Sequence, residues 1–452
     1  MISKKRIAIL GFGKEGLSAA NYLGVNNDVS IIDEKQKSEI EQESFKKLKA
    51  GAHFYFGGKL PERQNFDLII RSPSIRPDHS IIKKLKKSQS TLTSSTQIFF
   101  DECPCKIIGV TGTKGKGTTA TLIYEMLKTQ NKDVFLAGNI GTPALDILPK
   151  LKKGNIVILE LSSFQLIDLR KSPSIAVVLM ITQEHLDWHT NESEYKKSKE
   201  SLVSHQKKSD CAIINRDFEA SFSFAKKTKA KVFLFSQKSR TNGVYLKGTK
   251  ITSKITKEEE ICKINDILLP GRHNLQNAMA AIATAKILKI NNENIKKVLK
   301  KFKGLVHRLQ YLGKIQNVKF YNDSFSTIPE TTIAATDAIT GPKILILGGS
   351  SKNSDFTKLA KKIIQDKSIR SLVLIGNEAK KIKDVIFKAG NYSGEIVEGA
   401  TNMKEIASQA YAISKPKDTI ILSPACASFD MFKNYQDRGN QFIQEVQELK
   451  SK

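Results

Sequence analysis

A glycine-rich segment between a β-like run and a helical run constrains this chain more than any other feature. Residues 109–119 read Gly-Val-Thr-Gly-Thr-Lys-Gly-Lys-Gly-Thr-Thr and follow the apolar run 106–110. In such a strand–turn–helix unit, glycines let backbone N–H groups converge on phosphate oxygens, and a lysine neutralises phosphate charge. The segment therefore predicts a P-loop that binds ATP. The expected contacts are Gly112, Thr113, Lys114, Gly115, Lys116, Gly117 and Thr118.

This P-loop departs from the usual pattern in one position. A Ser or Thr normally follows the lysine directly and reaches Mg²⁺, but here Gly117 follows Lys116 and Thr118 comes next. We expect Thr118 to take the metal-binding role. A glycine-rich turn without a ligand is the alternative.

The fold class follows from the alternation of β-like apolar runs with helical periodicities along the whole chain. This alternation is typical of α/β domains with mainly parallel sheets. At roughly 150 residues per domain, 452 residues predict about three domains. We expect a Rossmann-like N-terminal domain over residues 1–96, a central P-loop ATPase domain over 97–303 and a C-terminal Rossmann-like α/β domain over 304–452. Strands are expected at 6–10, 29–32, 106–110, 134–137, 156–161, 175–181, 212–214, 319–321, 344–347, 372–375 and 419–422.

The N-terminal block opens with a second glycine motif, Gly11-x-Gly13-x-x-Gly16, after its first strand. Asp33 ends the next strand, near the spacing at which an acidic residue accepts a hydrogen bond from a ribose or base. The motif predicts a phosphate-approaching turn but does not name the nucleotide. A tight packing turn without a ligand and a dinucleotide-dependent oxidoreductase are the alternatives.

Two further polar groups follow strands of the central block. Glu160 lies at the end of the run 156–161, and His185 lies beyond the run 175–181. Because α/β sheets present ligands at the carboxyl ends of their strands, Glu160 is a Mg²⁺ candidate and His185 is a candidate ligand of a second metal. Taken alone, each is more simply a local hydrogen-bonding partner.

Composition restricts the cellular setting and the partners. No uncharged stretch approaches the roughly 18 apolar residues that a bilayer requires. No long apolar segment or small-residue cleavage site follows the first charged residues, so we expect no signal peptide. Five cysteines without paired spacing fit a reducing compartment. We expect a cytoplasmic protein without membrane insertion, and a monomer.

The formal net charge of +28 can attract nucleic acid. The lysine run 286–303, however, alternates with Ile, Leu and Val, as on the solvated face of an amphipathic helix, and no aromatic-interleaved basic motif accompanies it. We expect no nucleic-acid partner. A basic P-loop ATPase acting on nucleic acid remains an alternative.

Taken together, the motifs resemble those of the Mur ligase family, over essentially the whole chain. The phrases Leu-Ser-Ser-Phe-Gln-Leu and Ser-Pro-Ala-Cys-Ala-Ser are typical of its D-glutamate-adding branch. The motifs are Thr111-Gly-Thr-Lys-Gly-Lys116, Gly138-Asn-Ile-Gly141, Leu159-Glu-Leu-Ser-Ser-Phe-Gln165, Glu184-His-Leu-Asp-Trp-His189, Gly271-Arg-His-Asn-Leu-Gln-Asn277, Gly304-Leu-Val-His-Arg308, Tyr321-Asn-Asp-Ser324, Gly348-Gly-Ser-Ser-Lys352 and Leu422-Ser-Pro-Ala-Cys-Ala-Ser428.

The resemblance implies a reaction in peptidoglycan precursor synthesis. ATP would phosphorylate the carboxylate of UDP-N-acetylmuramoyl-L-alanine, and the amine of D-glutamate would attack the acyl phosphate. Mg²⁺, with Mn²⁺ as a substitute, would be held by Thr118 and Glu160, and a second ion by His185. Lys199, four residues after Tyr195, matches the family's N-carboxylated lysine, so that Lys116, Glu160, His185 and Lys199 would form the catalytic set. Without the family, Lys199 is an ordinary surface lysine.

The resemblance also implies three sets of binding residues. Asn277, Arg308 and Asp323 would hold the nucleotide, the last two from a C-terminal domain that closes on the P-loop. The amino acid would bind at Thr327, Lys352, Ser428 and the backbone near Tyr435. The UDP substrate would bind at Gly13, Lys14, Glu15, Asp33, Ser72 and Asn139.

Four positions depart from the family's pattern. Phe325 stands where some members carry a lysine, Ser74 stands where a glycine often follows Ser72-Pro73, and Glu15 puts an anion near the expected diphosphate. Gly117 resembles the folylpolyglutamate synthase branch of the superfamily. A ligase of that branch, or a Mur enzyme adding another amino acid, is therefore the nearest alternative, although that branch normally begins with its ATPase domain.

Overall fold

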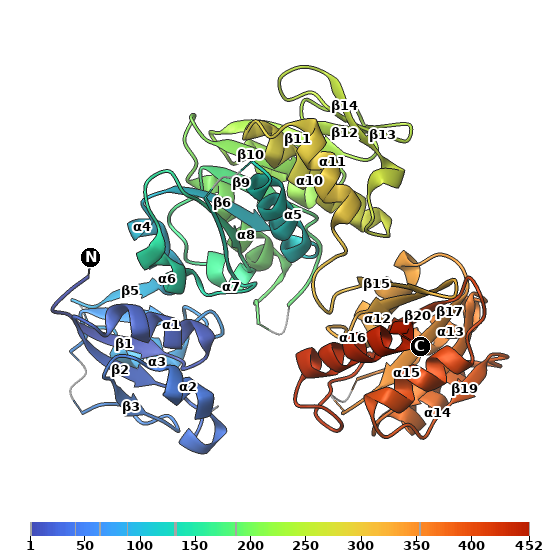
Figure 1. The fold of residues 1–452 in the computed structure, drawn as a ribbon. Coiled ribbons are helices and arrows are strands. Elements are labelled where there is room, and N and C mark those ends of the chain that lie inside the picture. Colours follow the sequence, from blue (N-terminus) through green and yellow to red (C-terminus); the bar gives the residue numbers. More distant parts are fainter. Residues whose placement is uncertain are drawn as a thin grey trace. The chain divides into compact units, whose positions relative to one another are not determined.

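The chain forms two compact units, each an α/β structure (Figure 1). The computed structural model describes residues 2–40, 42–62, 65–87, 89–130, 133–185, 188–351 and 354–451. The first unit comprises Met1–Asp266 with His273–Lys300, and the second comprises Ile267–Arg272 with Lys301–Lys452.

The N-terminal sheet of the first unit is wholly parallel, with the strand order β3-β2-β1-β4-β5. Its order reverses between β1 and β4, and ligands of open α/β sheets bind at such a switch point. The strands are β1 (Arg6–Leu10), β2 (Asp28–Ile32), β3 (His53–Tyr55), β4 (Leu68–Arg71) and β5 (Thr91–Ser94), and the helices are α1 (Lys14–Leu23), α2 (Gln42–Lys47), α3 (Ser80–Leu85) and α4 (Ser95–Glu102).

A second sheet follows in the order β14-β13-β12-β11-β10-β9-β6-β8-β7. It is parallel from β7 to β12, where buried apolar strands carry helices on their faces, and ends in an antiparallel hairpin edge. The strands are β6 (Lys106–Thr111), β7 (Val134–Gly138), β8 (Ile156–Glu160), β9 (Ile175–Val178), β10 (Cys211–Asn215), β11 (Lys231–Ser236), β12 (Val244–Lys247), β13 (Lys250–Ser253) and β14 (Glu259–Lys263). The helices are α5 (Lys116–Lys128), α6 (Ala144–Ile147), α7 (Ser163–Leu166), α8 (Glu192–Ser204), α9 (Glu219–Phe222), α10 (Arg272–Ile287) and α11 (Asn292–Lys301).

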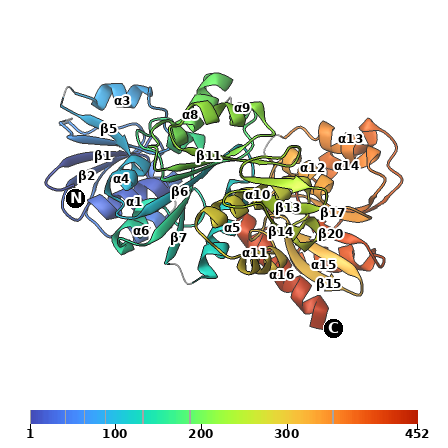
Figure 2. The same ribbon diagram turned by 90° about the horizontal axis from the view of Figure 1, so that it is seen from above.

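Helices α1, α4 and α6 lie side by side where the two sheets of the first unit meet (Figures 1 and 2). One hydrophobic cluster runs from strands of the N-terminal sheet into strands of the central sheet. Hydrogen bonds join Ser18 to Asp146 at 2.6 Å and Tyr22 to Glu102 at 2.8 Å. The two sheets therefore share a core.

The second unit holds one sheet in the order β15-β16-β20-β17-β18-β19, with hydrophobic clusters on both faces. Only the β15–β16 pair is antiparallel among its described pairings. The strands are β15 (Gln310–Ile315), β16 (Val318–Asn322), β17 (Lys343–Gly348), β18 (Ile369–Ile375), β19 (Glu395–Val397) and β20 (Thr419–Leu422), and the helices are α12 (Pro329–Ala338), α13 (Thr357–Gln365), α14 (Ala379–Ala389), α15 (Met403–Ala412) and α16 (Tyr435–Ser451).

The predicted α/β fold class is confirmed, and the expected strands form, although β9 ends at Val178 rather than at residue 181. The lysine run 286–303 is interrupted at 288–291, where Lys289 has a φ of 61° between α10 and α11. The domain boundaries at 96 and 303 stay predictions. None of the described helices is long and apolar enough to cross a membrane, and all five cysteines are free.

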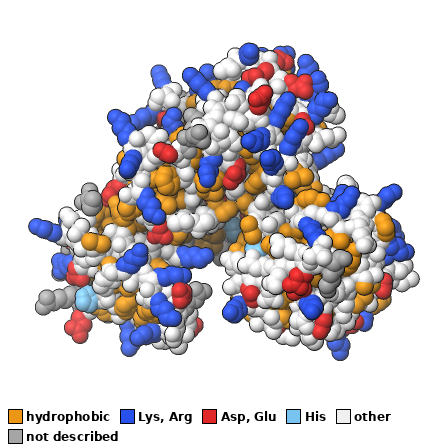
Figure 3. All heavy atoms as spheres, in the orientation of Figure 1, with side chains coloured by type: hydrophobic (Ala, Val, Ile, Leu, Met, Phe, Trp, Pro, Cys, Tyr) orange, Lys and Arg blue, Asp and Glu red, His pale blue; other side chains and the backbone are white. Residues whose placement is uncertain are grey.

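On the face drawn in Figure 3, Lys and Arg side chains are spread over the surface with acidic side chains among them.

Candidate active site

The P-loop connects the buried strand β6 to the N-terminus of α5, as the sequence predicts. Gly112 and Gly115 have φ values of 158° and 84°. A Cβ atom at Gly115 would lie 2.1 Å from Oδ1 of Asn277, which projects from α10. At Gly115 the loop thus has room for backbone atoms only. In addition, the first N–H groups of α5 have no carbonyl partner within the helix. Such a cradle fits a phosphate group.

Lys116 folds over this loop. Its Nζ donates to the carbonyl oxygens of Gly112 and Thr113, both at 3.0 Å. The amine therefore lies where a bound phosphate chain would pass the loop, ready to exchange carbonyl contacts for phosphate oxygens. Lys114, by contrast, points away to an ion pair with Glu184.

Thr113 joins the P-loop to two other segments. Its buried hydroxyl donates to the carbonyl oxygen of Thr182 at 3.0 Å, and it accepts from the Thr182 N–H at 2.9 Å. The hydroxyl of Tyr195 on α8 lies 2.9 Å from it. In the sequence, Tyr195 serves only to identify Lys199, four residues later. No sequence pattern predicts its contact with the P-loop.

Lys199 is the most unusual side chain of the site. It is 1% exposed, and its Nζ donates to the Gly112 carbonyl oxygen at 3.1 Å and lies 4.7 Å from the centroid of the Tyr195 ring. Burial, and then the positive charge of Lys116, lower the pKa of Lys199 well below its ordinary value. The interpretation of Lys199 as a surface lysine is wrong, because α8 turns this residue onto the P-loop. A neutral amine in this position is a nucleophile.

Glu160 ends β8 and is 6% exposed. Its Oε1 accepts a hydrogen bond from Nδ2 of Asn139 at 3.1 Å. Asn139 is an expected contact of the UDP substrate. In the structure it orients Glu160, the expected metal ligand. Thr118, in the first turn of α5, is 7% exposed.

His185 has a left-handed backbone, with a φ of 58°, and a side chain that is 43% exposed. Its ring centroid lies 4.9 Å from that of Phe164. A carboxylate, a hydroxyl and phosphate oxygens suit Mg²⁺. Within the described part of the chain, however, no three His, Cys, Asp or Glu side chains form a ready metal cluster. These residues fit a metal that ATP, or a carboxylated Lys199, helps to hold.

All the expected UDP-substrate residues except Asn139, which follows β7 of the central sheet, gather at the carboxyl edge of the N-terminal sheet. Asp33 accepts hydrogen bonds from the N–H groups of Phe12 at 2.7 Å and Lys35 at 2.9 Å, and so holds the glycine turn. The Ser72 hydroxyl lies 3.4 Å from the Gly11 carbonyl oxygen. Two further members, Gly13 and Lys14 at the start of α1, are exposed.

Glu15 is the largely buried member of this set. Its carboxylate accepts from Nε2 of Gln165 at 3.1 Å, and burial raises the pKa of Glu15 to about 7. At neutral pH the group is therefore poised between its charged and uncharged forms.

In the second unit, Asp323 follows β16 and Ser428 follows the adjacent strand β20, while Arg308 lies just before β15. Asp323 is 3% exposed and accepts from the Leu309 N–H at 2.9 Å and the Ser423 hydroxyl at 2.8 Å, and burial raises its pKa to about 6. The Arg308 guanidinium lies over the Phe325 ring, which packs perpendicular to the Tyr435 ring. Ser428 is buried, Thr327 is half-buried, and Lys352 lies outside the described residues.

Arg438 is a residue of this region that the sequence did not single out. It is fully buried and donates to Ser324 through its Nε and to the carbonyl oxygens of Ala427 and Cys426. It thereby fixes the loop that leads to Ser428. Its sequence surroundings, on a polar helix, carry no signal of burial.

The parallel sheets and the phosphate cradle define an α/β P-loop nucleotide-binding protein. Residues 110–285 match the family model of the Mur ligase middle domain, and residues 307–426 match that of the Mur ligase glutamate ligase domain. The chain belongs to the Mur ligase family, and is thus an enzyme of the ligase class. The resemblance inferred from the motifs is confirmed, and the oxidoreductase alternative falls.

Full-length relatives support this assignment. The chain is 37% identical to a UDP-N-acetylmuramoylalanine–D-glutamate ligase from Acetivibrio thermocellus, over 100% of this chain and 98% of the relative. It is 34% identical to the enzyme of the same name from Clostridium tetani, over 99% and 98%.

Solved structures support the fold. UDP-N-acetylmuramate-alanine ligase MurC from Thermotoga maritima matches 99% of this chain and 100% of its own, with a TM-score of 0.58 and 17% identity. MurF from Acinetobacter baumannii matches 98% of this chain and 93% of its own, with a TM-score of 0.61 and 14% identity.

Proposed function

We propose that this chain is an ATP-dependent ligase that joins D-glutamate to UDP-N-acetylmuramoyl-L-alanine. The full-length relatives carry that name. The observation that carries the proposal is the buried Lys199 amine, 3.1 Å from the P-loop carbonyl of Gly112 and beside Lys116. A buried lysine of lowered pKa next to a phosphate cradle indicates a functional site, because burial of an amine costs folding free energy that a surface lysine does not cost.

The chemistry explains why a P-loop is needed. A carboxylate is a poor electrophile, so the terminal L-alanine carboxylate first attacks the γ-phosphorus of ATP and releases ADP. The resulting acyl phosphate is attacked by the D-glutamate amine, which loses a proton as phosphate leaves and an amide bond forms. Lys116 stabilises the negative charge that moves along the phosphate chain.

Three unmodified side chains fit the metal ions of this reaction. Thr118 and Glu160 would hold one Mg²⁺, with Asn139 orienting Glu160 at 3.1 Å, and His185 would hold a second. When bound, the metal neutralises phosphate charge and brings two anionic reactants together.

Lys199 would complete the second site as a carbamate. Its neutral amine adds to CO₂, and loss of one proton leaves an anionic oxygen donor where an ammonium group stood. The lowered pKa of Lys199 favours this step, because only the unprotonated amine is nucleophilic.

The substrates are assigned by family position. UDP-N-acetylmuramoyl-L-alanine would bind at the carboxyl edge of the N-terminal sheet through Gly13, Lys14, Glu15, Asp33 and Ser72, with Asn139 reaching it from the central sheet. D-Glutamate would bind in the second unit through Thr327, Lys352, Ser428 and the backbone near Tyr435, and the nucleotide through Asn277, Arg308 and Asp323. We also propose that the protein is a cytoplasmic monomer that acts in peptidoglycan precursor synthesis.

The nearest alternative is another amide ligase of the superfamily, since Gly117 follows the P-loop lysine. The deciding experiment measures phosphate release from ATP with Mg²⁺ and UDP-N-acetylmuramoyl-L-alanine, in separate reactions with D-glutamate, L-glutamate, L-lysine and meso-diaminopimelate. We expect turnover with D-glutamate alone. Turnover with another amino acid alone would keep the chemistry and overturn the acceptor, and no turnover with any of them would overturn the proposed substrate.

A further inference from the structure

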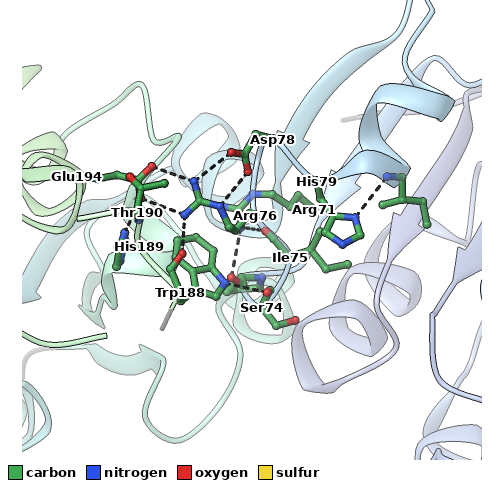
Figure 4. Close-up of polar contacts among 12 residues, drawn as sticks. Arg71, Ser74, Ile75, Arg76, Asp78, His79, Trp188, His189, Thr190 and Glu194 are labelled. Carbon is green, nitrogen blue, oxygen red and sulfur yellow. Dashed lines mark hydrogen bonds and ion pairs between the residues drawn. The ribbon is translucent and has the colours of Figure 1, made fainter. Parts of the chain in front are cut away.

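Two arginines from one short segment tie the N-terminal sheet to the central sheet (Figure 4). Arg71, the last residue of β4, is fully buried and pairs with both carboxylate oxygens of Asp168 at 2.9 Å. It also donates to the carbonyl oxygens of Phe164 at 2.9 Å and Ile75 at 2.7 Å. A charge this deeply buried is tolerated because each side of the guanidinium has a partner.

Arg76 makes the second link, five residues later. Two of its nitrogens donate to the two carboxylate oxygens of Glu194, both at 3.0 Å, and its Nε donates to Asp78 at 2.9 Å. The Arg76 hydrogen bonds lower the pKa of Glu194 to about 2, so the pair is ionised at neutral pH. Such a fork-to-fork pair fixes orientation as well as distance.

Trp188 closes the contact from the central side. Arg76 donates to its carbonyl oxygen at 2.5 Å, and the guanidinium carbon lies 5.2 Å from the indole ring. The indole N–H donates to the Ser74 carbonyl oxygen at 2.9 Å. Figure 4 shows Arg76 enclosed by Asp78, Glu194 and Trp188. We call Arg76, Trp188 and Glu194 the Arg76 clamp.

The clamp holds both elements that carry the expected second metal site. Glu194 lies in the first turn of α8, directly before Tyr195, whose hydroxyl contacts Thr113 of the P-loop, and the same helix carries Lys199. The N–H groups of Trp188 and His189 donate to the His185 carbonyl oxygen at 3.2 and 2.9 Å. Arg76 therefore fixes the start of α8 and Trp188, whose N–H is bonded to the His185 carbonyl oxygen.

On its other side the clamp reaches the expected UDP-substrate edge. The segment that holds Arg76 begins at Ser72, whose hydroxyl lies 3.4 Å from the Gly11 carbonyl oxygen in the glycine turn. The Ile75 N–H donates back to the Ser72 carbonyl oxygen at 3.0 Å, so the segment folds as a turn. Because Ser72 and Arg76 lie in one short, hydrogen-bonded segment, a movement of Ser72 would also move Arg76.

We propose that Arg76 and Trp188 are positioning residues, which place His185 and Lys199 for catalysis in response to the UDP substrate bound at the N-terminal sheet. This inference rests on the proposed function. Trp188 belongs to the family motif Glu184–His189, whereas Arg76 and Glu194, which form the ion pair of the clamp, lie outside the family motifs of the sequence.

Trp188 is the single tryptophan of the chain, so emission excited at wavelengths that tryptophan absorbs and the ten tyrosines do not reports on the clamp. The first experiment titrates the full-length protein with UDP-N-acetylmuramoyl-L-alanine in EDTA and without ATP, while calorimetry measures binding separately. We expect a saturable change in Trp188 emission whose midpoint equals the calorimetric Kd. In Arg76→Met, which keeps the aliphatic stem and loses the fork, we expect binding without the emission change and greater quenching by acrylamide.

The second experiment compares kcat and KM. Misplacement of reacting groups by an ångström costs up to about 100-fold, so we expect Arg76→Met to lower kcat by about tenfold with little change in the KM for ATP. Arg76→Lys, which keeps the charge, should recover part of kcat, and Trp188→Phe should lose part of it. Arg370→Met is the matched control, because Arg370 forms a half-buried ion pair with Asp418 in the second unit. It should lower stability without changing kcat or the Trp188 response.

The outcomes separate the clamp from the proposed function. If wild-type protein turns over with D-glutamate and Arg76→Met keeps its kcat and its emission change, the clamp is a structural contact and the inference is overturned. If Arg76→Met loses kcat no more than the equally destabilised Arg370→Met, the inference is likewise overturned. No turnover by the wild-type protein would overturn the proposed function and, with it, this inference.

Discussion

The guanidinium carbon of Arg308 lies 4.3 Å from the centroid of the Phe325 ring. The same ring packs perpendicular to the Tyr435 ring, with centroids 5.1 Å apart and planes at 87°. Phe325 stands where some family members carry a lysine. A lysine there would repel Arg308, whereas the face of an aromatic ring attracts a cation. The substitution exchanges one possible phosphate contact for a support that holds Arg308.

Removing that support should weaken nucleotide binding. A cation–π contact at a partly exposed site contributes about 0.5–1 kcal/mol, so Phe325→Leu should raise the Kd for ATP about two- to fivefold. Phe325→Trp should restore it, because indole is the better partner for a cation. Calorimetry with ATP checks both variants, with the exposed Phe387→Leu as control. An unchanged Kd in Phe325→Leu would show that Arg308 does not depend on the ring.

Lys199 should carry a carbamate in the active protein. Lys199→Ala should lower kcat by at least about 100-fold, as the loss of a directly acting group does, while the exposed Lys197→Ala on the same helix should retain it. Protein equilibrated with ¹³C-bicarbonate should show a carbamate carbon signal in wild type and in Lys197→Ala. A fully active protein that lacks this signal would refute the assignment.

The same modification should depend on pH in a defined direction. Because burial lowers the pKa of Lys199, its amine is neutral at a lower pH than an exposed lysine. The signal should therefore persist at pH values at which an exposed lysine is fully protonated, and disappear on acidification. Carbamate loss at the pH typical of an exposed lysine would contradict the burial of this side chain.

The sequence predicts the parts of this protein that local pattern determines. The P-loop lies between β6 and α5 as expected, because glycine spacing and flanking hydrophobicity specify that unit within about twenty residues. Contacts between distant segments left no such pattern. Glu194 pairs with Arg76 across 118 positions, and Lys199 reaches Gly112 across 87. The local sequence reveals neither of these two contacts. A lysine in the same helical sequence can be either solvated or buried.

Gly115 should tolerate no side chain. Its φ of 84° costs an L-residue about 1–2 kcal/mol, and a Cβ would meet Oδ1 of Asn277 at 2.1 Å. Gly115→Ala should therefore weaken ATP binding by at least about tenfold, by combining strain with displacement of Asn277. UDP-substrate binding should be unchanged.

Gly248→Ala is the control for backbone strain without displacement of a neighbouring side chain. Gly248 has a φ of 59°, but a Cβ at this position would have no atom within 4 Å, so the substitution introduces the strain without the clash. Calorimetry should show normal ATP affinity for Gly248→Ala. An equal loss in both variants would mean that general destabilisation, and not the phosphate cradle, explains the effect.

Glu15 should make both stability and UDP-substrate binding depend on pH near neutrality. Burial raises its pKa from 4.5 to about 7. For a carboxyl group with a raised pKa, the folded protein binds more protons than the unfolded chain between these values. Its stability contribution is therefore fully present below about pH 4.5 and is lost as the pH rises through 7.

Glu15→Gln removes this titration and keeps a side chain of the same shape beside Gln165. Between pH 4.5 and pH 8, the unfolding free energy of Glu15→Gln should rise relative to that of wild type by up to about 3 kcal/mol. Solvent screening at this partly exposed group makes the gain smaller. In wild type the Kd for UDP-N-acetylmuramoyl-L-alanine should rise above pH 7, because the ionised carboxylate repels a diphosphate. In Glu15→Gln it should stay level. Denaturation midpoints and calorimetry across this range check both effects, with the exposed Glu293→Gln as control. Parallel pH profiles for wild type and Glu15→Gln would show that Glu15 is ionised throughout this range. Burial would then not raise its pKa, and its charge would not affect binding of the diphosphate.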